Sequence, residues 1–279
     1  MAYHFKLSEA PAVAVRRVCC ECIGEALKRL EKPNHPAAIH TARKEIKKLR
    51  AIFNLVRQEI GRGAHRKNNA TLREAATHLA VPRDARVMFK AFEKLSGQPA
   101  KQFGDMAAKL KRHSHREARQ FRKSDLVARA KKLLRKTNRR IGRLKIKATG
   151  WTVLEPGWKE GYELGRKACD LARRDPDPEH LHEWRKRVKQ LWYYFRLLGP
   201  GRHTVMEDLQ SLGELLGDEH DLFLLQQFVA VHGRGLSWEE TALNRLIATR
   251  RKELRLAALK LGSRLYTGAN EIEYPRLKK

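Results

Sequence analysis

The sequence predicts an all-α protein built from an internal repeat. Its apolar residues recur at the three- and four-residue spacing of amphipathic helices, and no stretch keeps the two-residue alternation of a half-buried strand for long. Prolines punctuate the chain at plausible helix ends instead of being spread through it. One basic stretch recurs in the second half in the same order. Two helical halves of related design are therefore expected.

The repeat is clearest in "HTARKEIKKLRAIF" at 40–53 and "HEWRKRVKQLWYYF" at 182–195. At an offset of 142 residues, the histidine, the cations and the leucine of the pattern H-x-x-R-K-x-x-K-x-L meet their counterparts. The similarity extends upstream, where 31–40 matches 173–182 at the same offset. Charge that serves solubility alone has no reason to recur in this order.

Helical periodicity and punctuation divide the chain into two sets of expected helices. The first set lies at 8–31, 36–59, 66–80, 84–95 and 101–147, and the second at 155–174, 178–198, 203–216, 219–232 and 237–267. At 279 residues the chain is long enough to bury a proper core. We expect a single domain of two four-helix-type bundles, from 1–149 and 150–279, related by a pseudo-two-fold axis.

The charge balance indicates a polyanionic partner. The chain has 60 basic and 31 acidic residues, a net charge of +29, and a hydrophobic content of 42% that excludes a disordered basic tail. Such an excess of one sign destabilises a compact monomer by self-repulsion. Nucleic acid, an acidic membrane surface and inorganic polyphosphate all qualify on charge alone.

Cysteine usage and the N-terminal sequence favour the cytoplasm. Cys19, Cys20 and Cys22 crowd one expected helix, and Cys169 stands alone, so neither a disulfide framework nor zinc-ligand spacing is present. Arg16 and Arg17 interrupt the apolar patch near the start, which is typical of neither a secretory signal nor a membrane span. No membrane partner is expected.

Both copies of the basic stretch are two-sided on a helical wheel. In the first, Ile46, Leu49 and Phe53 lie opposite a polar face that falls within about 80° of His40. The candidate anion-binding residues on these polar faces are His40, Arg43, Lys44, Lys47, Lys48 and Arg50, and in the second copy His182, Arg185, Lys186, Lys189 and Tyr193. A solvated face is the alternative, although surface helices normally interleave glutamate with lysine.

Further candidate contacts lie on other helices. They are Arg112, Arg116 and Arg119 on a long basic ridge, Arg250 in the second half, and Arg16 with its neighbour Arg17. Arg16 falls on an apolar face, where an unpaired buried guanidinium is costly. Its side chain is therefore expected either to reach solvent or to line a cavity that holds an anion or an acid.

The paired H-x-x-R-K-x-x-K-x-L motif in an all-helical basic chain resembles the CHAD family. This resemblance implies two four-helix bundles around a basic groove or pore that binds inorganic polyphosphate. It implies phosphate contacts from His40, Arg43, Lys44, Lys47, His182, Arg185, Lys186 and Lys189. It also implies association with polyphosphate granules. The resemblance covers nearly the whole chain.

Enzymatic alternatives have weaker support. The sequence contains neither a P-loop nor a G-x-S-x-G elbow, so we expect a non-catalytic protein without a cofactor. "GDEHD" at 217–221 offers Asp218, Glu219 and His220 as metal ligands of a phosphohydrolase. When 72–85 is aligned with 209–222, the aspartate is the one residue of GDEHD that recurs, Asp84 against Asp221, which favours a helix cap or an arginine partner.

Nucleic-acid binding through phosphate contacts is the main alternative to polyphosphate binding. Against it, the sequence shows no helix-turn-helix, zinc-finger or RNA-recognition signature. Phe53, Tyr194 and Phe195 fall on or beside the core side of their helices, where base stacking is excluded, and Trp192 and Tyr193 are the exceptions. Nucleic acid is therefore the secondary partner, and a metal-dependent phosphohydrolase comes third.

Overall fold

The prediction of an all-α fold is confirmed. A computed structural model describes residues 3–33, 37–96, 103–199, 203–233 and 237–266, and its regular elements there are all helices. The first half holds α1 (Pro11–Arg29), α2 (Ala38–Leu55), α3 (Arg57–His78), α4 (Val81–Ser96), α6 (Gly104–Lys123) and α7 (Leu126–Ile141). The second half holds the 3₁₀ helix η1 (Trp151–Leu154), α8 (Glu155–Arg174), α9 (Pro178–Leu198), α10 (His203–His232) and α11 (Ser237–Tyr266).

Three of the predicted helix boundaries are wrong. The long helix expected at 101–147 is two helices, because Ser124 takes an extended backbone conformation and its hydroxyl donates to the Phe121 carbonyl at 2.7 Å. Conversely, the helices expected at 203–216 and 219–232 are one continuous helix, α10. The helix expected from residue 66 already begins at Arg57 as α3 and is interrupted at Gly61, whose φ is +80°.

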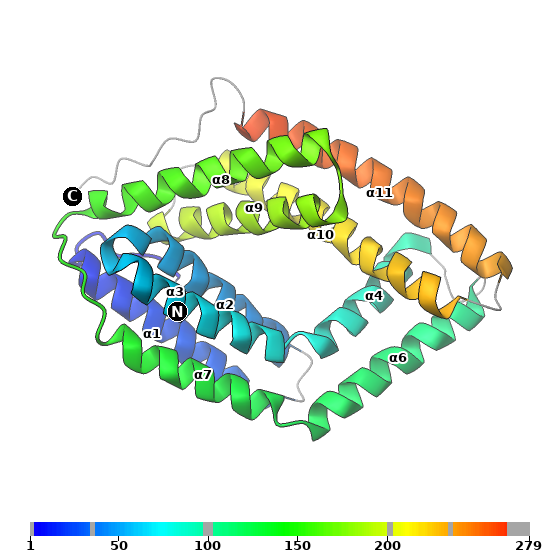
Figure 1. Ribbon diagram of the computed structural model, residues 1–279, viewed down its shortest axis with the longest axis horizontal. Coiled ribbons are helices and arrows are strands. Elements are labelled where there is room, and N and C mark those ends of the chain that lie inside the picture. The colour runs from blue at the N-terminus through cyan, green and yellow to red at the C-terminus, as the bar shows by residue number, and fades with distance from the viewer. Residues whose placement is uncertain (1–2, 34–36, 97–102, 200–202, 234–236, 267–279) are drawn as a thin grey trace.

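The hydrophobic core consists of two clusters that do not follow the division of the chain at residue 150. The first cluster is formed by α1, α2, α3, α7, α8 and α9 with the beginning of α10 and the end of α11. The second joins α4 and α6 to the remaining parts of α10 and α11 (Figure 1). The chain's two halves therefore share both cores.

The length of α10 and α11 explains how the second half contributes to both core clusters. Each has 30 residues and extends about 45 Å, which is enough to pass from one cluster to the other. The first half covers the corresponding path with pairs of shorter helices, α3 followed by α4 and α6 followed by α7. The seam between the clusters lies at the junction of α3 with α4 and in the middle of α10.

The two helices that carry the repeated motif, α2 and α9, pack against each other within the first cluster. The amide of Asn54 on α2 donates to the side chain of Gln190 on α9 at 3.0 Å. Gly157 lets α8 cross the end of α2 closely, since a Cβ at this position would lie 2.0 Å from the Leu55 carbonyl oxygen. Close backbone packing thereby fixes α2 against α8, and a side-chain hydrogen bond links α2 to α9.

Candidate polyanion-binding site

The packing of α2 against α9 brings cations of the two motif copies within electrostatic reach. Burial is the main cause that lowers the pKa of Lys189 and of His182, and the charges of Lys44 and Lys47, respectively, lower these pKa values further. Lys44 and Lys47 are exposed, whereas Lys189 and His182 are half-buried. We call the eight motif side chains the motif cluster: His40, Arg43, Lys44, Lys47, His182, Arg185, Lys186 and Lys189.

The motif cluster lies at the seam between the two core clusters. The Arg43 guanidinium donates to the carbonyl oxygen of Ala76, near the end of α3. Arg185 lies against Gly217 in the middle of α10, with its Nη2 3.3 Å from the position of a Cβ there. The site is thus built where α3 gives way to α4 and where α10 crosses from one core to the other.

Lys189 is held in a partly dehydrated and strongly positive environment. Burial is the main cause that lowers its pKa, and the charge of Arg185 is the second. Its ammonium lies over the Trp192 ring, 5.0 Å from the centroid, where the electron-rich face compensates part of the lost hydration. Glu214 partly opposes the shift, so the surroundings are not free of acid.

Two glycines of α10, Gly213 and Gly217, lie directly against these cations, and their role was not predicted from the sequence. A Cβ at Gly213 would lie 2.7 Å from Cε of Lys189, and Gly217 sits beneath Arg185 in the same way. Their spacing of four residues places both on one face of α10, as Lys189 and Arg185 share one face of α9. The pattern G-x-x-x-G in a helical stretch was the available signal for this close approach.

Replacing Gly213 by alanine is expected to weaken polyanion binding severalfold without destabilising the fold. The new methyl group displaces the flexible end of Lys189, whereas alanine in a helix is favoured over glycine by roughly 0.5–1 kcal/mol. Gly24→Ala on α1 is the matched control, because no atom lies within 4 Å of its Cβ position. Calorimetric titration and thermal unfolding of both variants measure the two effects. Unchanged affinity in the Gly213 variant would contradict the placement of Lys189.

The pKa of His182 is lowered, so its side chain is neutral in this site near pH 7. Burial first, and then the charges of Lys186 and Arg185, lower its pKa to about 4. Its ring lies against that of His220 on α10, with 4.3 Å between the centroids, and its Nδ1 is buried without a hydrogen bond to any described residue. In the protein without ligand, His182 is therefore not expected to become protonated near pH 6.5, where an ordinary histidine does. A strengthening of anion binding in that pH range is not expected from this side chain.

Lys186 is the exposed member of the second copy, and it is partly neutralised. Its ammonium pairs with Glu183 at 2.6 Å, and the same carboxylate accepts Arg187 at 2.7 Å. Both pairs are solvent-accessible, so water and salt screen them strongly. Lys186 can exchange this contact for an anionic ligand at little cost.

The three side chains that suggested a metal site diverge. Asp218 pairs with Lys94 of α4, and the His220 ring lies tilted against that of His182. Glu219 is buried and accepts Arg251 at 2.7 Å and 2.9 Å and Arg255 at 2.9 Å. Within the described residues, no group of three or more histidine, cysteine or acidic side chains is placed to hold a metal ion. The hypothesis of a metal centre at Asp218, Glu219 and His220 is not supported.

Two candidate residues at the edges of the α2 polar face are used for internal contacts. Lys48 pairs with the buried carboxylate of Glu45 at 2.6 Å. Arg50 donates to the side chain of Asn69 on α3 at 2.8 Å, and burial lowers its pKa. Both positions lie about 80° from His40 on the helical wheel, where α2 meets its neighbours. The sequence prediction therefore assigned too many residues of α2 to the anion-binding face.

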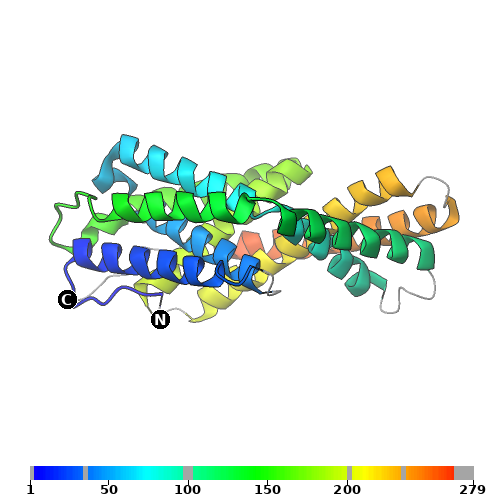
Figure 2. The same cartoon turned by 90° about the horizontal axis from the view of Figure 1, so that it is seen from below.

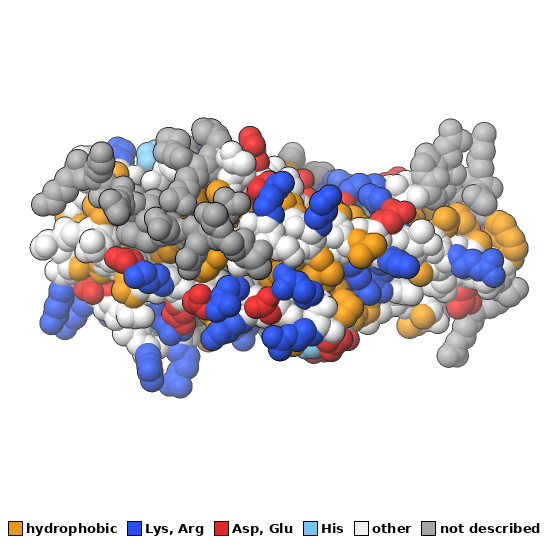
Figure 3. All heavy atoms as spheres, turned by 90° about the horizontal axis from the view of Figure 1, so that it is seen from above, with side chains coloured by type: hydrophobic (Ala, Val, Ile, Leu, Met, Phe, Trp, Pro, Cys, Tyr) orange, Lys and Arg blue, Asp and Glu red, His pale blue; other side chains and the backbone are white. Residues whose placement is uncertain are grey.

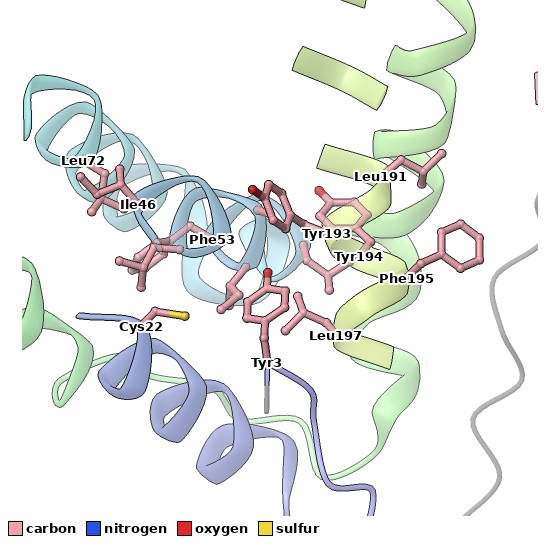
Figure 4. Close-up of a cluster of buried hydrophobic side chains, with 14 of the residues drawn as sticks. Tyr3, Cys22, Ile46, Phe53, Leu72, Leu191, Tyr193, Tyr194, Phe195 and Leu197 are labelled. Carbon is pink, nitrogen blue, oxygen red and sulfur yellow. The ribbon is translucent and has the colours of Figure 1, made fainter. Parts of the chain in front are cut away.

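The prediction that Tyr193 lies on the polar face of α9 is wrong. Its side chain is 5% exposed and meets Tyr3 edge-on, with ring centroids 6.0 Å apart (Figure 4). The N-terminal segment causes this burial, because it covers α9 near its end and the Phe5 amide donates to the Leu197 carbonyl at 2.8 Å. The two-sided pattern of α9 thus holds only in its first turns.

Arg16 and Arg17 make hydrogen bonds and ion pairs with other residues of the protein. The Arg16 guanidinium donates to the Leu144 carbonyl at 2.7 Å, and the residue is partly exposed. Arg17 pairs with Glu9 at 2.9 Å and with Glu21 at 3.1 Å. These contacts hold the N-terminal segment and the chain after α7 against α1.

The remaining candidates lie on other helices than the motif cluster. Arg112, Arg116 and Arg119 are exposed on α6. Arg250 is exposed on α11 and pairs with Glu253 at 2.7 Å. The motif cluster itself is carried by α2 and α9 of the first core cluster, whereas α6 packs into the second cluster except at its end, where Phe121 belongs to the first.

A model of the CHAD domain matches residues 17–230 of the chain. The chain belongs to the CHAD family. No curated protein sequence is significantly similar to it. In the helices that the structure describes, none combines the length and apolar character needed to cross a bilayer.

Solved structures share the fold of this CHAD protein. PptA from Streptomyces chartreusis superposes with a TM-score of 0.71 at 15% identity, over 92% of this chain and 100% of that one. The crystal structure of the CHAD domain from the plant Ricinus communis superposes with a TM-score of 0.69 at 19% identity, over 100% of this chain and 96% of that one. At these identities the similarity establishes the fold alone.

Proposed function

We propose that this CHAD protein binds inorganic polyphosphate without chemical turnover, through the motif cluster, and that this binding holds it at polyphosphate granules. The supporting observation is that the packing of α2 against α9 brings cations of both motif copies together, with Lys44 close enough to half-buried Lys189 for their like charges to repel. Mutual repulsion of this kind is relieved when an anion binds between the groups. Membership of the CHAD family, which is associated with polyphosphate, supports the same ligand.

Polyphosphate suits the chemistry of the cluster. It is a flexible chain with about one negative charge per phosphate and no bases to recognise, so neutralisation suffices for binding. Arginines such as Arg185 offer forked contacts to phosphate oxygens, and lysines such as Lys44 and Lys189 offer point charges. The repetition of the motif extends these contacts along a chain of phosphates.

Base recognition has less support at this site. Phe53, Tyr194 and Phe195 are buried in the first core cluster and cannot stack on bases (Figure 4). Trp192 is half-buried between Lys189 and Arg196, both of which lie over its ring. The aromatic side chains of α9 therefore serve packing and the placement of cations.

Titration with polyphosphates of increasing length tests the proposed function. Affinity is expected to rise with chain length until the site is filled, and to fall steeply with salt because phosphate contacts release counterions. Binding should be unchanged in EDTA, and no orthophosphate should be released from polyphosphate or nucleoside triphosphates. Calorimetry and a phosphate assay on the same samples measure both properties.

Asp221→Ala is the control for a hidden hydrolase. Asp221 is the aspartate that the repeat pairs with Asp84, so it is the acidic residue on which a catalytic role would fall first. Metal-dependent phosphate release that disappears in this variant would overturn the non-catalytic proposal. Tight binding without turnover in both proteins would support it.

A further inference from the structure

Nearly half of the net charge lies outside the motif helices, in one short part of the chain. Residues 104–147 contain 17 basic and 3 acidic residues, which gives 17 − 3 = +14 of the total of +29. The segment comprises α6, α7 and the residues that follow α7. By the same count, α2 carries five basic residues and one acidic residue, or +4. The motif cluster therefore does not account for the basicity of the protein.

The cations of this segment occupy the outer faces of both helices. On α6 the side chains of Met106, Leu110 and Phe121 are buried, and on α7 those of Leu134 and Ile141 are buried. The exposed cations on the opposite faces are Lys111, Arg112, Arg116, Arg119, Arg122 and Lys123 on α6, and Arg129, Lys132, Arg135, Lys136 and Arg139 on α7. We call this set the α6–α7 ridge.

The α6–α7 ridge forms one long face of the molecule. Figure 2 shows α7 and α6 following one another along the side turned to the viewer, with α4, α10 and α11 behind α6. With 20 and 16 residues, the two helices extend about 30 Å and about 24 Å. Each helix presents cations over roughly half of its circumference, so the ridge carries several rows of charge and not a single line.

Most cations of the α6–α7 ridge make no ion pair with a described residue. The exceptions among them are Arg116, which lies 3.6 Å from Glu117, and Arg129, which pairs with Asp125 at 2.8 Å. The opposite side of the molecule differs, because Figure 3 shows acidic side chains interspersed with basic ones there. Arg166, Arg173 and Arg250 on α8 and α11 each pair with a carboxylate, at 2.8 Å, 3.1 Å and 2.7 Å.

The ridge is confined to one half of the chain. The helix that covers the corresponding path in the second half, α11, carries seven basic and three acidic residues, or +4, whereas α6 and α7 together carry 14 basic and two acidic residues, or +12. The motif, by contrast, is present in both halves. A feature of one half alone is not part of a site that both halves build together.

We propose that the α6–α7 ridge binds the phosphate backbone of double-stranded nucleic acid, independently of base sequence and of the motif cluster. A duplex presents two rows of phosphates on either side of a groove, which match a convex helix with cations over half its surface. The two helices meet at an angle (Figure 1), and their lengths of about 30 Å and about 24 Å correspond to about nine and seven base pairs at 3.4 Å per pair.

Two other polyanions fit the ridge less well. A single polyphosphate chain on a convex surface touches one row of cations and leaves the others unneutralised. A membrane-bound helix normally inserts apolar side chains beside its cations. The exposed large apolar residues in the described part of the protein are Val13, Leu171, Val231, Trp238, Leu246 and Leu256, and none of them lies on α6 or α7.

Three variants, each lacking three cations, test the proposal against a duplex of about 20 base pairs, longer than the ridge. The ridge variant carries Arg135→Gln, Lys136→Gln and Arg139→Gln. The matched control carries Arg166→Gln, Arg173→Gln and Arg250→Gln, which are exposed but ion-paired and lower the net charge equally. The motif variant carries Arg185→Gln, Lys186→Gln and Lys189→Gln.

The ridge variant should bind the duplex about tenfold or more weakly, with the slope of log K against log salt reduced by about 2.7, that is, about 0.9 for each lost contact. The matched control and the motif variant should each change duplex affinity by less than about threefold. Polyphosphate affinity should be retained in the ridge variant.

Equal losses of duplex affinity in the ridge variant and the matched control would mean that bulk charge alone binds the duplex, and would overturn the proposal. A larger loss in the motif variant would place the duplex in the motif cluster and would also overturn it. The proposal would also be overturned if the ridge variant lost more affinity for anionic phosphatidylserine vesicles than for the duplex. Failure of polyphosphate binding in the wild-type protein, by contrast, would contradict only the proposed function.

Discussion

Replacing Arg185, Lys186 and Lys189 together by glutamine is expected to weaken polyphosphate binding by several kcal/mol. Charge-assisted contacts contribute roughly 1.5–3 kcal/mol each, and neighbouring contacts are not additive. Lys189 should contribute most, because it is already partly dehydrated before the ligand arrives. Lys186 should contribute least, because it gives up its pairing with Glu183. Calorimetric titration with long-chain polyphosphate measures the loss.

The position of the cations on the fold, and not their number, should decide this effect. The ridge substitutions Arg135→Gln, Lys136→Gln and Arg139→Gln remove the same charge and should cost much less, mainly through the long-range field. The corresponding motif change at Arg43, Lys44 and Lys47 should resemble the first set, since both copies meet at one site. All variants should stay helical by circular dichroism. Similar losses for all three sets would reduce the motif to a solvated basic face.

Replacing Glu219 by alanine is expected to lower the free energy of unfolding by about 3–5 kcal/mol. The Glu219 side chain is 2% exposed and is the shared acceptor of Arg251 and Arg255. Its removal leaves Arg251, whose side chain is 11% exposed, without a carboxylate, although Gln226 still accepts from it at 2.5 Å. Urea unfolding followed by circular dichroism measures the change.

Glu253→Ala is the control for this prediction. Glu253 pairs with Arg250 on the surface of α11, the helix that also carries Arg251 and Arg255. Exposed pairs of this kind contribute no more than about 1 kcal/mol. Replacing Arg251 and Arg255 by methionine in the Glu219→Ala background should restore much of the stability, because no unpaired charge then stays in the interior. A loss at Glu219 no larger than that at Glu253 would show that the cluster is open to water.

The helices and the motif faces could be predicted because they depend on local periodicity. The first turns of α2 and α9 obey the two-sided pattern, so Lys44, Lys47 and Lys186 are exposed as that pattern requires. Residues at the edge of the arc, such as Lys48 and Arg50, could not be assigned from one helix alone. Their environment is set by which neighbour lies beside that edge.

Contacts between segments far apart in the chain could not be predicted from helical periodicity. Tyr193 is buried by the N-terminal segment, which lies far from it in the chain, and Glu219 is enclosed by arginines of α11. Gly213 and Gly217 acquire their role only where α9 crosses α10. The shared second core likewise depends on α10 and α11 being long enough to reach it, and a predicted break near residue 217 concealed that length.

Competition between polyphosphate and duplex nucleic acid tests the central claim most directly. Labelled long-chain polyphosphate is bound to the wild-type protein at physiological salt and challenged with unlabelled polyphosphate, duplex DNA or duplex RNA at equal total phosphate. Unlabelled polyphosphate should displace the label, whereas either duplex should leave most of it bound, because a duplex on the α6–α7 ridge does not occupy the motif cluster. Displacement by either duplex at an equal or lower phosphate concentration would contradict a polyphosphate-binding site at the motif cluster.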